Sequence, residues 1–388
     1  MSLSRRALFT RESRSTAGLR QLISARGREA LVAELGPLGG ESGLIPAPQN
    51  GEIRLTSNEN PLGPFPASME AIRAGFGADA GRYPDNVQPG MGDLTNALAE
   101  RIGCATSNLV LGAGSGEILK SAAQAFTGPD RPLVTASPSY MQTPRVAEYL
   151  GAEVRSVPVT AGGMLDLDAM AEAARDAGLV FFCNPNNPTG TVHTAADVRE
   201  FVDTVQRTSP TTVIHMDEAY HEYVTDPGYE SAVGMALERE NVFVSRTFSK
   251  CFGMAGMRVG YGIGSGRTIE KLQTLALTVN IAVPTLAGAH VALQDPAREL
   301  KERERNTVAR TYTIGFFNGL GYEVMLSQTN FIFVNIGRPA AGFRSACREH
   351  GVGVGRNFPP MEQTHARISI GTLDEMTRAC GVFKQVLA

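Results

Sequence analysis

Short apolar runs alternate with amphipathic helical patterns from about residue 90 to 265, and this alternation constrains the fold more than any other feature. Some runs, such as residues 179–183, are apolar at every position, and such strands need cover on both faces. The alternation therefore predicts an α/β fold in which a mostly parallel sheet lies between helices. The predicted strands span residues 109–111, 133–135, 154–157, 179–183, 213–216, 242–245 and 259–263.

Helices are predicted between these strands and again in the C-terminal part of the chain. A charged, helix-prone stretch at 296–318 predicts a long solvated helix with Glu299 and Arg303 at i,i+4 spacing. Thr372 and Glu375 form a capping box at the start of the last helix. Further predicted helices span residues 22–35, 117–126, 143–150, 195–206 and 340–350, and further strands span 53–55, 322–325, 331–336 and 367–370.

The chain has 388 residues, which is long for one compact core. We therefore expect two domains with a cleft between them. The large domain is predicted at 66–295, and the small domain combines 41–65 with 296–388. Residues 1–40 are predicted to form a leader and an N-terminal helix.

Composition excludes several classes of function. The formal net charge of −3 does not suggest a surface for nucleic acid. The five cysteines include no CxxC pair and no Cys/His cluster at zinc-ligand spacing, so we expect no metal site and free thiols in a reducing compartment. No apolar run approaches the ~20 residues of a membrane-spanning helix.

The N-terminus resembles a twin-arginine export signal at Arg5 and Arg6. A signal peptide continues into an apolar core, whereas this segment continues with Arg11 and Glu12. We therefore predict a cytoplasmic protein, with export through this leader as the alternative.

The strongest local motif is Ser245-Arg246-Thr247-Phe248-Ser249-Lys250, with Arg258 shortly after it. A lysine next to a buried strand is desolvated, which lowers its pKa and favours the nucleophilic amine. Hydroxyls and a guanidinium beside it suit a phosphate monoester. Taken alone, a surface Ser-Lys pair would be the simpler interpretation.

Three other motifs follow predicted strands, where ligands bind in parallel sheets. Asp217 could keep a ring nitrogen protonated, as electron-sink cofactors require, although an acid after a strand is often a helix cap. Asn187 lies in the rigid turn 184–190 and could present its amide to a ligand oxygen, although plain turn chemistry explains the same residues. The small residues 112–116 could cradle a phosphate at a helix N-terminus, but they do not fit the dinucleotide fingerprint.

Together these motifs resemble the class I/II aminotransferase family of fold-type I pyridoxal-phosphate enzymes, and most closely its histidinol-phosphate aminotransferase branch. The resemblance runs from about residue 53 to the C-terminus. It also includes the sequences Ser57-Asn58-Glu59-Asn60-Pro61-Leu62-Gly63-Pro64, Arg82-Tyr83-Pro84-Asp85, Pro138-Ser139-Tyr140 and Ala366-Arg367-Ile368-Ser369-Ile370-Gly371-Thr372.

The resemblance implies the cofactor pyridoxal 5'-phosphate and a role for each matching residue. Lys250 would form the Schiff base and move the proton, and Asp217 would pair with the pyridine nitrogen. Asn187 and Tyr220 would bond the ring oxygen, and Tyr140 would stack on the ring. The phosphate would be held by Ser115, Gly116, Thr247, Ser249 and Arg258. The substrate would be bound by Arg367, Arg356 and Asn60.

The resemblance also implies a homodimer that moves an amino group from histidinol phosphate, an aromatic amino acid or another L-amino acid to a 2-oxo acid such as 2-oxoglutarate. Leu62 stands where the branch often has a tyrosine, Gly116 replaces a common aspartate, and Cys251 replaces a common small residue. A pyridoxal-phosphate decarboxylase, lyase or cyclase is the alternative, and a non-catalytic binder is a third hypothesis. The joint presence of Lys250, Asp217 and Arg258 argues against the binder.

Overall fold

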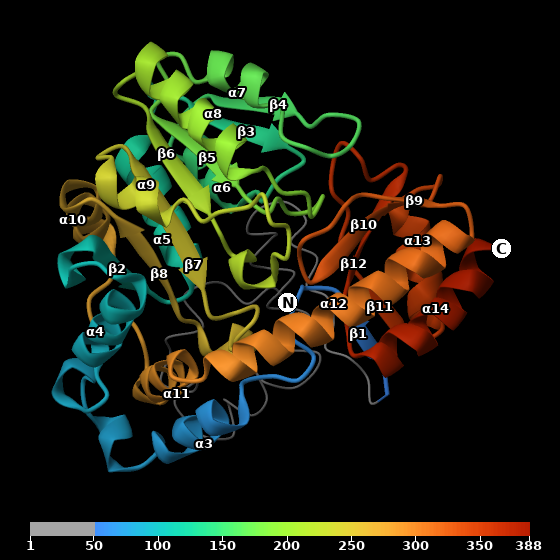
Figure 1. Ribbon diagram of the computed structural model, residues 1–388, viewed down its shortest axis with the longest axis horizontal. Coiled ribbons are helices and arrows are strands. Elements are labelled where there is room, and N and C mark those ends of the chain that lie inside the picture. Colours follow the sequence, from blue (N-terminus) through green and yellow to red (C-terminus); the bar gives the residue numbers. More distant parts are fainter. Residues whose placement is uncertain (1–50) are drawn as a thin grey trace, which may run out of the picture. The chain divides into compact units, whose positions relative to one another are not determined.

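Seven strands form the largest sheet of the protein (Figure 1). They are β2 (Leu109–Gly112), β3 (Leu133–Ser137), β4 (Val154–Pro158), β5 (Leu179–Cys183), β6 (Val213–Asp217), β7 (Val242–Thr247) and β8 (Gly260–Gly264). The computed structural model, which describes residues 51–388, orders them β2-β8-β7-β6-β5-β3-β4. Only β8 of this sheet is antiparallel to its neighbours. The predicted α/β class, the mostly parallel sheet and all seven strands are confirmed.

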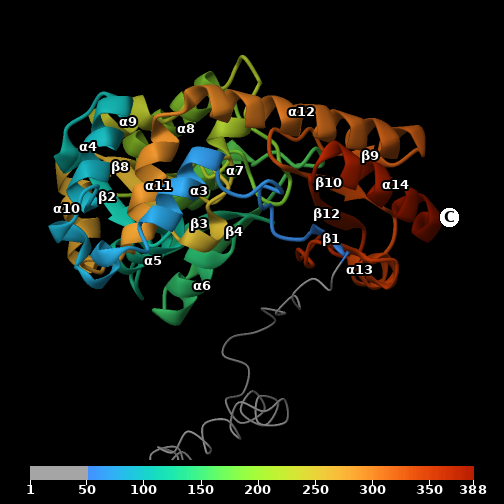
Figure 2. The same cartoon turned by 90° about the horizontal axis from the view of Figure 1, so that it is seen from below.

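Helices cover both faces of this sheet, and strand β5 shows why its sequence is apolar throughout. Leu179, Phe181 and Cys183 pack on one face, and Val180 and Phe182 pack on the other. Figure 2 shows the two helical layers from the side. One layer contains α5 (Ser115–Phe126), α6 (Gln142–Tyr149) and α10 (Gly266–Leu275). The other contains α3 (Pro66–Ala74), α4 (Met91–Ile102), α7 (Leu167–Ala173), α8 (Ala195–Thr208), α9 (Val233–Glu238) and α11 (Val283–Leu293).

A second hydrophobic core lies in the C-terminal part of the chain. Its three-stranded antiparallel sheet has the order β12 (His365–Ser369), β10 (Phe331–Asn335) and β9 (Glu323–Val324). Strand β1 (Ile53–Leu55) pairs in parallel with β11 (Val352–Val354), so the N-terminal strand joins this core. The helices around it are α12 (Pro296–Gly319), α13 (Ala340–Glu349) and α14 (Leu373–Leu387), and single 3₁₀ turns elsewhere are η3 (Ala78–Gly81), η4 (Pro84–Asn86), η5 (Thr106–Asn108), η6 (His221–Tyr223) and η7 (Ala255–Met257).

Helix α12 confirms the predicted long helix but corrects its predicted surroundings. Glu302 and Arg310 are buried, so one face of the helix is not solvated. The Tyr223 hydroxyl donates to Glu302 Oε1, and Arg310 Nη1 donates to the Thr329 carbonyl. Glu299 pairs with Arg101 from α4. The local pattern predicted Arg303 as the partner of Glu299. The structure pairs Glu299 with Arg101 instead, which is distant in sequence and cannot be found from i,i+4 spacing.

Several other predictions can be placed. The capping box of α14 is confirmed, since Thr372 Oγ1 accepts from Glu375 N at 3.2 Å and Glu375 Oε2 accepts from Thr372 N at 2.7 Å. Strand β11 was not predicted. The arginine-rich leader and the predicted helix at 22–35 lie outside the described residues, and the predicted domain boundaries stay a prediction. Within residues 51–388, no helix is long and apolar enough to cross a membrane.

Candidate active site

The carboxyl ends of neighbouring parallel strands bring the predicted polar residues to one edge of the large sheet. Tyr140 follows β3, Asn187 follows β5, Asp217 ends β6, and Lys250 follows β7. The antiparallel strand β8 begins at the same edge, directly after Arg258 and Val259. Ligands of open α/β sheets bind at this edge, so the topology explains why motifs far apart in the sequence meet.

Lys250 places a buried amine in the centre of the site. Its Nζ donates to the Ser57 carbonyl at 3.2 Å and lies 5.6 Å from the centre of the Tyr220 ring. Burial lowers the pKa of Lys250 to about 8, and the positive charge of Arg367 acts in the same direction. The free amine therefore forms at a lower pH than in an exposed lysine, as its position after a buried strand predicted.

Asp217 is a buried carboxylate without an ion-pair partner among residues 51–388. Its Oδ1 accepts from the Ser245 hydroxyl at 3.0 Å, and the Cys183 thiol lies 3.9 Å from Oδ2. Burial raises the pKa of Asp217 to about 6, against the effect of the Ser245 hydrogen bond. A buried carboxylate is stabilised by a cationic partner, and a protonated ring nitrogen is such a partner.

The Tyr220 hydroxyl accepts two hydrogen bonds. Asn58 Nδ2 donates to it at 3.0 Å and Asn187 Nδ2 at 3.2 Å. A phenol that accepts two bonds keeps its own proton for a further oxygen. Burial raises the Tyr220 pKa, so this proton stays in place. Arg367 extends the network, because its Nη1 donates to Asn187 Oδ1 at 2.9 Å.

The buried guanidinium of Arg367 joins the small-sheet strand β12 to this network. Its Nη2 donates to the Thr56 carbonyl at 2.6 Å, while Nε has no hydrogen-bond partner among the described residues. Its Cζ lies 4.7 Å from the centre of the Phe358 ring, and Arg356 Cζ lies 4.4 Å from the same ring. Two guanidiniums close to one ring form a strongly cationic corner.

A cradle for a small anion lies where α5 begins. The backbone of Gly114 is left-handed, with φ of 78°, and a Cβ there would collide with the Arg258 guanidinium. Arg258 Nη1 donates to Ser249 Oγ at 3.3 Å, and the Thr247 hydroxyl donates to the same oxygen at 2.9 Å. The N-terminal amides at Ser115 and the helix dipole favour negative charge here.

Tyr140 and Gly116 lie next to this cradle. Gln142 connects them, since its Nε2 donates to the Gly116 carbonyl at 2.6 Å and its Oε1 accepts from the Tyr140 hydroxyl at 3.3 Å. Burial raises the Tyr140 pKa, and the charge of Asp217 acts on it in the same direction. Tyr140 therefore lies within electrostatic reach of Asp217.

Asn60, whose predicted role in substrate binding stays a prediction, bonds to backbone atoms in this structure. Its Nδ2 donates to the Cys251 carbonyl at 2.9 Å and its Oδ1 accepts from Leu62 N at 3.0 Å, so both polar ends bind backbone. Asn58, two residues earlier, contacts Tyr220 and was not singled out from the sequence. Its φ of 56° is uncommon for a residue other than glycine, and this feature is visible only in the backbone.

The site thus contains the groups that pyridoxal phosphate needs. Lys250 offers an amine, Asp217 a buried carboxylate with no ion-pair partner among residues 51–388, and the start of α5 an anion cradle with Arg258. Within residues 51–388, no group of three or more His, Cys, Asp or Glu side chains could hold a metal ion. The Lys250 amine, the Asp217 carboxylate and the anion cradle together fit an organic phosphate cofactor.

Comparison with known proteins agrees with this geometry. Residues 50–383 match the family model for aminotransferase class I and II. The chain is 35% identical over 336 residues to a histidinol-phosphate aminotransferase of Symbiobacterium thermophilum, covering 86% of this chain and 90% of the relative. It is 34% identical over 319 residues to an aromatic amino acid aminotransferase of Streptomyces avermitilis, covering 82% and 86%.

A solved structure shows the same fold with the cofactor bound. The histidinol-phosphate aminotransferase of Sinorhizobium meliloti, in complex with pyridoxal-5'-phosphate, superposes with a TM-score of 0.78 at 26% identity. The match covers 86% of this chain and 90% of that one. The chain therefore belongs to the class I and II aminotransferase family and is a pyridoxal-phosphate-dependent aminotransferase.

Proposed function

We propose that this aminotransferase takes the amino group of histidinol phosphate or of an aromatic L-amino acid and passes it to a 2-oxo acid such as 2-oxoglutarate. The observation that carries the proposal is the cationic corner formed by Arg367 and Arg356 beside the cofactor residues. Arg367 is buried and its Nε has no partner among the described residues, so it is arranged for an anion. The names of the two relatives support this choice of donor.

Lys250 is proposed to move the proton of the reaction. When bound, pyridoxal phosphate supplies an aldehyde for the amino group and a ring that withdraws electrons from the substrate Cα–H bond. The Lys250 amine would accept the Cα proton and would then donate it to the carbon of the cofactor's aldehyde group. Its pKa of about 8 suits general acid–base work near neutral pH.

Asp217, Asn187 and Tyr220 are proposed to hold the ring. Asp217 keeps the ring nitrogen protonated, because a buried carboxylate favours a cation beside it. Tyr220 and Asn187 are hydrogen-bonded to each other, and both would donate to the ring oxygen of the cofactor. Asn58 fixes the Tyr220 hydroxyl, and we add it to the proposed site.

The phosphate is proposed to lie in the cradle at the start of α5, and Tyr140 is proposed to stack on the ring. Arg258 supplies a guanidinium at this point, and its side chain is in contact with Ser249. The backbone amides of Ser115 and Gly116 face the same space. The Thr247 and Ser249 hydroxyls add donors that can turn toward the anion.

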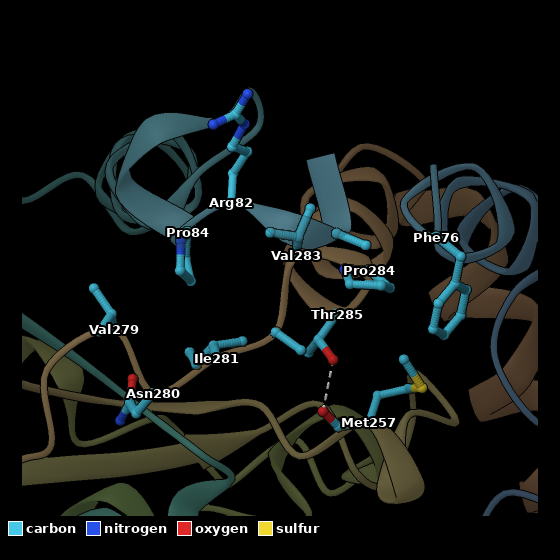
Figure 3. Close-up of a pocket in the computed structure, with 12 residues that line it drawn as sticks. Phe76, Arg82, Pro84, Met257, Val279, Asn280, Ile281, Val283, Pro284 and Thr285 are labelled. Carbon is cyan, nitrogen blue, oxygen red and sulfur yellow. Dashed lines mark hydrogen bonds between the residues drawn. The ribbon is translucent and has the colours of Figure 1, made fainter. Parts of the chain in front are cut away.

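The protein is also proposed to be a homodimer. A pocket of about 490 Å³ lies beside the start of α11, lined by Phe76, Met257 and neighbouring residues (Figure 3). Phe76 is 69% exposed, and Tyr83 and Leu277 close to the pocket in sequence are 70% and 71% exposed. Exposed apolar side chains around one hollow are typical of a surface that another chain covers. Met257 precedes the phosphate arginine Arg258, so a second copy here would adjoin the cofactor site.

A cytoplasmic location is proposed on the state of the cysteines. All five are free thiols, and four of them are buried. Free thiols are typical of proteins from reducing compartments. Export through the arginine-rich leader remains the competing proposal, and fractionation of cells that produce the full chain decides between them.

A half-reaction screen tests the proposed reaction and its donor together. The purified protein, loaded with pyridoxal phosphate, is mixed with one amino donor at a time and no oxo acid, while absorbance is recorded. We expect stoichiometric pyridoxamine phosphate and the matching oxo compound, fastest with histidinol phosphate or an aromatic amino acid. Release of carbon dioxide or ammonia would instead assign a decarboxylase or lyase.

The Lys250→Ala variant is the control for this screen. It should fold and bind pyridoxamine phosphate, because the cradle and Asp217 are unchanged. Its half-reaction should slow by a factor on the order of 10²–10⁴, the contribution of a positioned acid–base group. Near-normal rates in this variant would contradict the role proposed for Lys250.

A further inference from the structure

Three side chains on adjacent strands form a hydrogen-bonded row that ends on Asp217. His215 Nε2 lies 2.8 Å from Ser245 Oγ, and Ser245 Oγ lies 3.0 Å from Asp217 Oδ1. Asp217 and Ser245 are register partners on β6 and β7, and His215 precedes Asp217 by two residues. All three side chains therefore project from the same face of the sheet.

The direction of the hydrogen bonds follows from their chemistry. An ionised carboxylate only accepts, so the Ser245 proton is given to Asp217 Oδ1. The Ser245 oxygen can then accept from His215, which requires the proton of the imidazole to be on Nε2. His215 Nδ1, the other ring nitrogen, has no partner among the described residues. An unprotonated Nδ1 without a partner costs less free energy in the interior than an unpaired N–H group would.

The surroundings of His215 are apolar. Its ring stacks on Phe243 with 4.2 Å between centres, and the edge of Phe181 lies at 5.5 Å. The residue is fully buried, and burial lowers its pKa to about 3, so the ring is neutral at physiological pH. His215 therefore acts on Ser245 as a single hydrogen-bond donor and not as a positive charge.

Two polar side chains in this layer need an explanation beyond packing. Val213 and Phe243 occupy the same face of β6 and β7 and belong to its hydrophobic core. Burial of an imidazole and a hydroxyl there costs hydration free energy, and apolar side chains of similar size would not have this cost. What the pair adds is a fixed orientation of the Asp217 carboxylate, with Oδ1 engaged and Oδ2 turned to the thiol of Cys183.

We propose that His215 and Ser245 are positioning residues that orient the Asp217 carboxylate and hold it in its accepting form for the ring nitrogen of the cofactor. The proposal rests on the ring-nitrogen role proposed above for Asp217. Neither residue touches the reacting atoms. Their contribution is to remove the rotational freedom of Asp217, so that the cofactor meets a preorganised partner.

The test is the affinity of the apoprotein for pyridoxamine phosphate, which cannot bond covalently to Lys250 and so reports the non-covalent contacts. Ser245→Val and Ser245→Thr form a matched pair, because they have nearly the same shape and differ in the hydroxyl. We expect Ser245→Val to raise Kd about tenfold, equivalent to about 1.4 kcal/mol, and Ser245→Thr to stay within about twofold of the wild type.

Combination with Asp217→Asn separates this proposal from the one on which it rests. Asp217→Asn alone should raise Kd, and Ser245→Val should add nothing in that background. If Asp217→Asn binds like the wild type, the ring-nitrogen role of Asp217 is wrong. The positioning role of Ser245 is wrong if Asp217→Asn weakens binding but Ser245→Val does not. It is also wrong if Ser245→Val has its full effect in both backgrounds.

Two further variants guard against general damage to the sheet. Thr135→Val removes a buried hydroxyl from β3 of the same sheet and should leave Kd unchanged. His215→Gln keeps a donor that can reach Ser245, whereas His215→Leu removes it. If Ser245→Val does not fold, the two His215 variants decide. A higher Kd for His215→Leu than for His215→Gln supports the proposed positioning role, and equal Kd values overturn it.

Discussion

Desolvation of the Lys250 amine lowers the pH at which it loses its proton. The amine rests on the Ser57 carbonyl, and the nearby Arg367 charge opposes a second positive charge. Because the folded pKa is lowered from 10.5 to about 8, the protonated form is the one that the site disfavours. The free amine therefore accumulates as the pH rises through about 8, well before an exposed lysine would lose its proton.

The lowered pKa of Lys250 gives a first prediction. In the apoprotein, reaction of Lys250 with an amine-directed reagent should increase with pH along a curve whose midpoint is about 8. An unperturbed lysine would have its midpoint at about 10.4. Mass spectrometry of the peptide that contains Lys250 follows the reaction at this residue alone. A midpoint near 10 would mean that the amine is not desolvated.

Arg367 carries a second prediction at the residue scale. Arg367→Met should raise KM for the amino donor about 10- to 100-fold, because hydrogen bonds to a charged group contribute about 1.5–3 kcal/mol. Arg367→Lys keeps the charge but loses the fork that reaches Asn187 and Thr56, so it should recover only part of the loss. Steady-state kinetics with each donor measure both. An unaltered KM in Arg367→Met would remove Arg367 from the substrate site.

At the scale of single elements, the turn into α5 is set by one glycine. Gly114 has φ of 78° and lies against the Arg258 guanidinium, so it allows both the turn and the arginine. Gly103, which ends α4, has the same φ of 78°, but a Cβ added there would meet no atom within 4 Å among the described residues. The two glycines share a positive φ, but they differ in ψ, which is 162° at Gly114 and 38° at Gly103, and in what surrounds them.

The third prediction uses this pair. Gly103→Ala should cost about 1–2 kcal/mol of stability, the strain of a left-handed alanine. Gly114→Ala should cost more, because a backbone with φ of 78° and ψ of 162° is essentially restricted to glycine. Only Gly114→Ala should also weaken pyridoxamine phosphate binding, because the added methyl displaces Arg258 from the cradle. Thermal unfolding and equilibrium titration measure the two effects separately. Equal affinities in the two variants would show that Arg258 does not hold the phosphate.

Elements were predictable from the sequence to the extent that their signals are local. Strand β5 of the large sheet is apolar at every position, and the capping box at Thr372 lies within four residues. Strand β11 has only three residues, and its pairing with β1 joins positions about 300 residues apart. The buried face of α12 was missed for the same reason, since its partners at Tyr223 and Thr329 are not local.

At the scale of the whole molecule, the strand order brings the site together. Asn187, Asp217 and Lys250 follow three consecutive strands of the sheet, β5, β6 and β7, so their meeting could be expected from a parallel sheet. The contribution of Asn58 could not, because it depends on a left-handed backbone and on contacts with both Tyr220 and Ser369. The sequence motifs locate the residues of the site, whereas long-range contacts determine that the Asn58 amide bonds to the Tyr220 hydroxyl.

The proposed dimer gives the last prediction, which belongs to the molecule as a whole. Phe76 lines the pocket at α11 and is 69% exposed, and Leu277, two residues before the lining residue Val279, is 71% exposed. In the proposed dimer, a glutamate at either position would be buried against apolar side chains. A buried, unpaired charge costs several kcal/mol, so Phe76→Glu with Leu277→Glu should convert a particle of twice 41.3 kDa to one of 41.3 kDa in sedimentation. Tyr149→Glu is the matched control, because Tyr149 is 90% exposed on α6 and does not line the pocket. If the double variant keeps the wild-type mass, or if Tyr149→Glu lowers it equally, the second copy does not cover this surface.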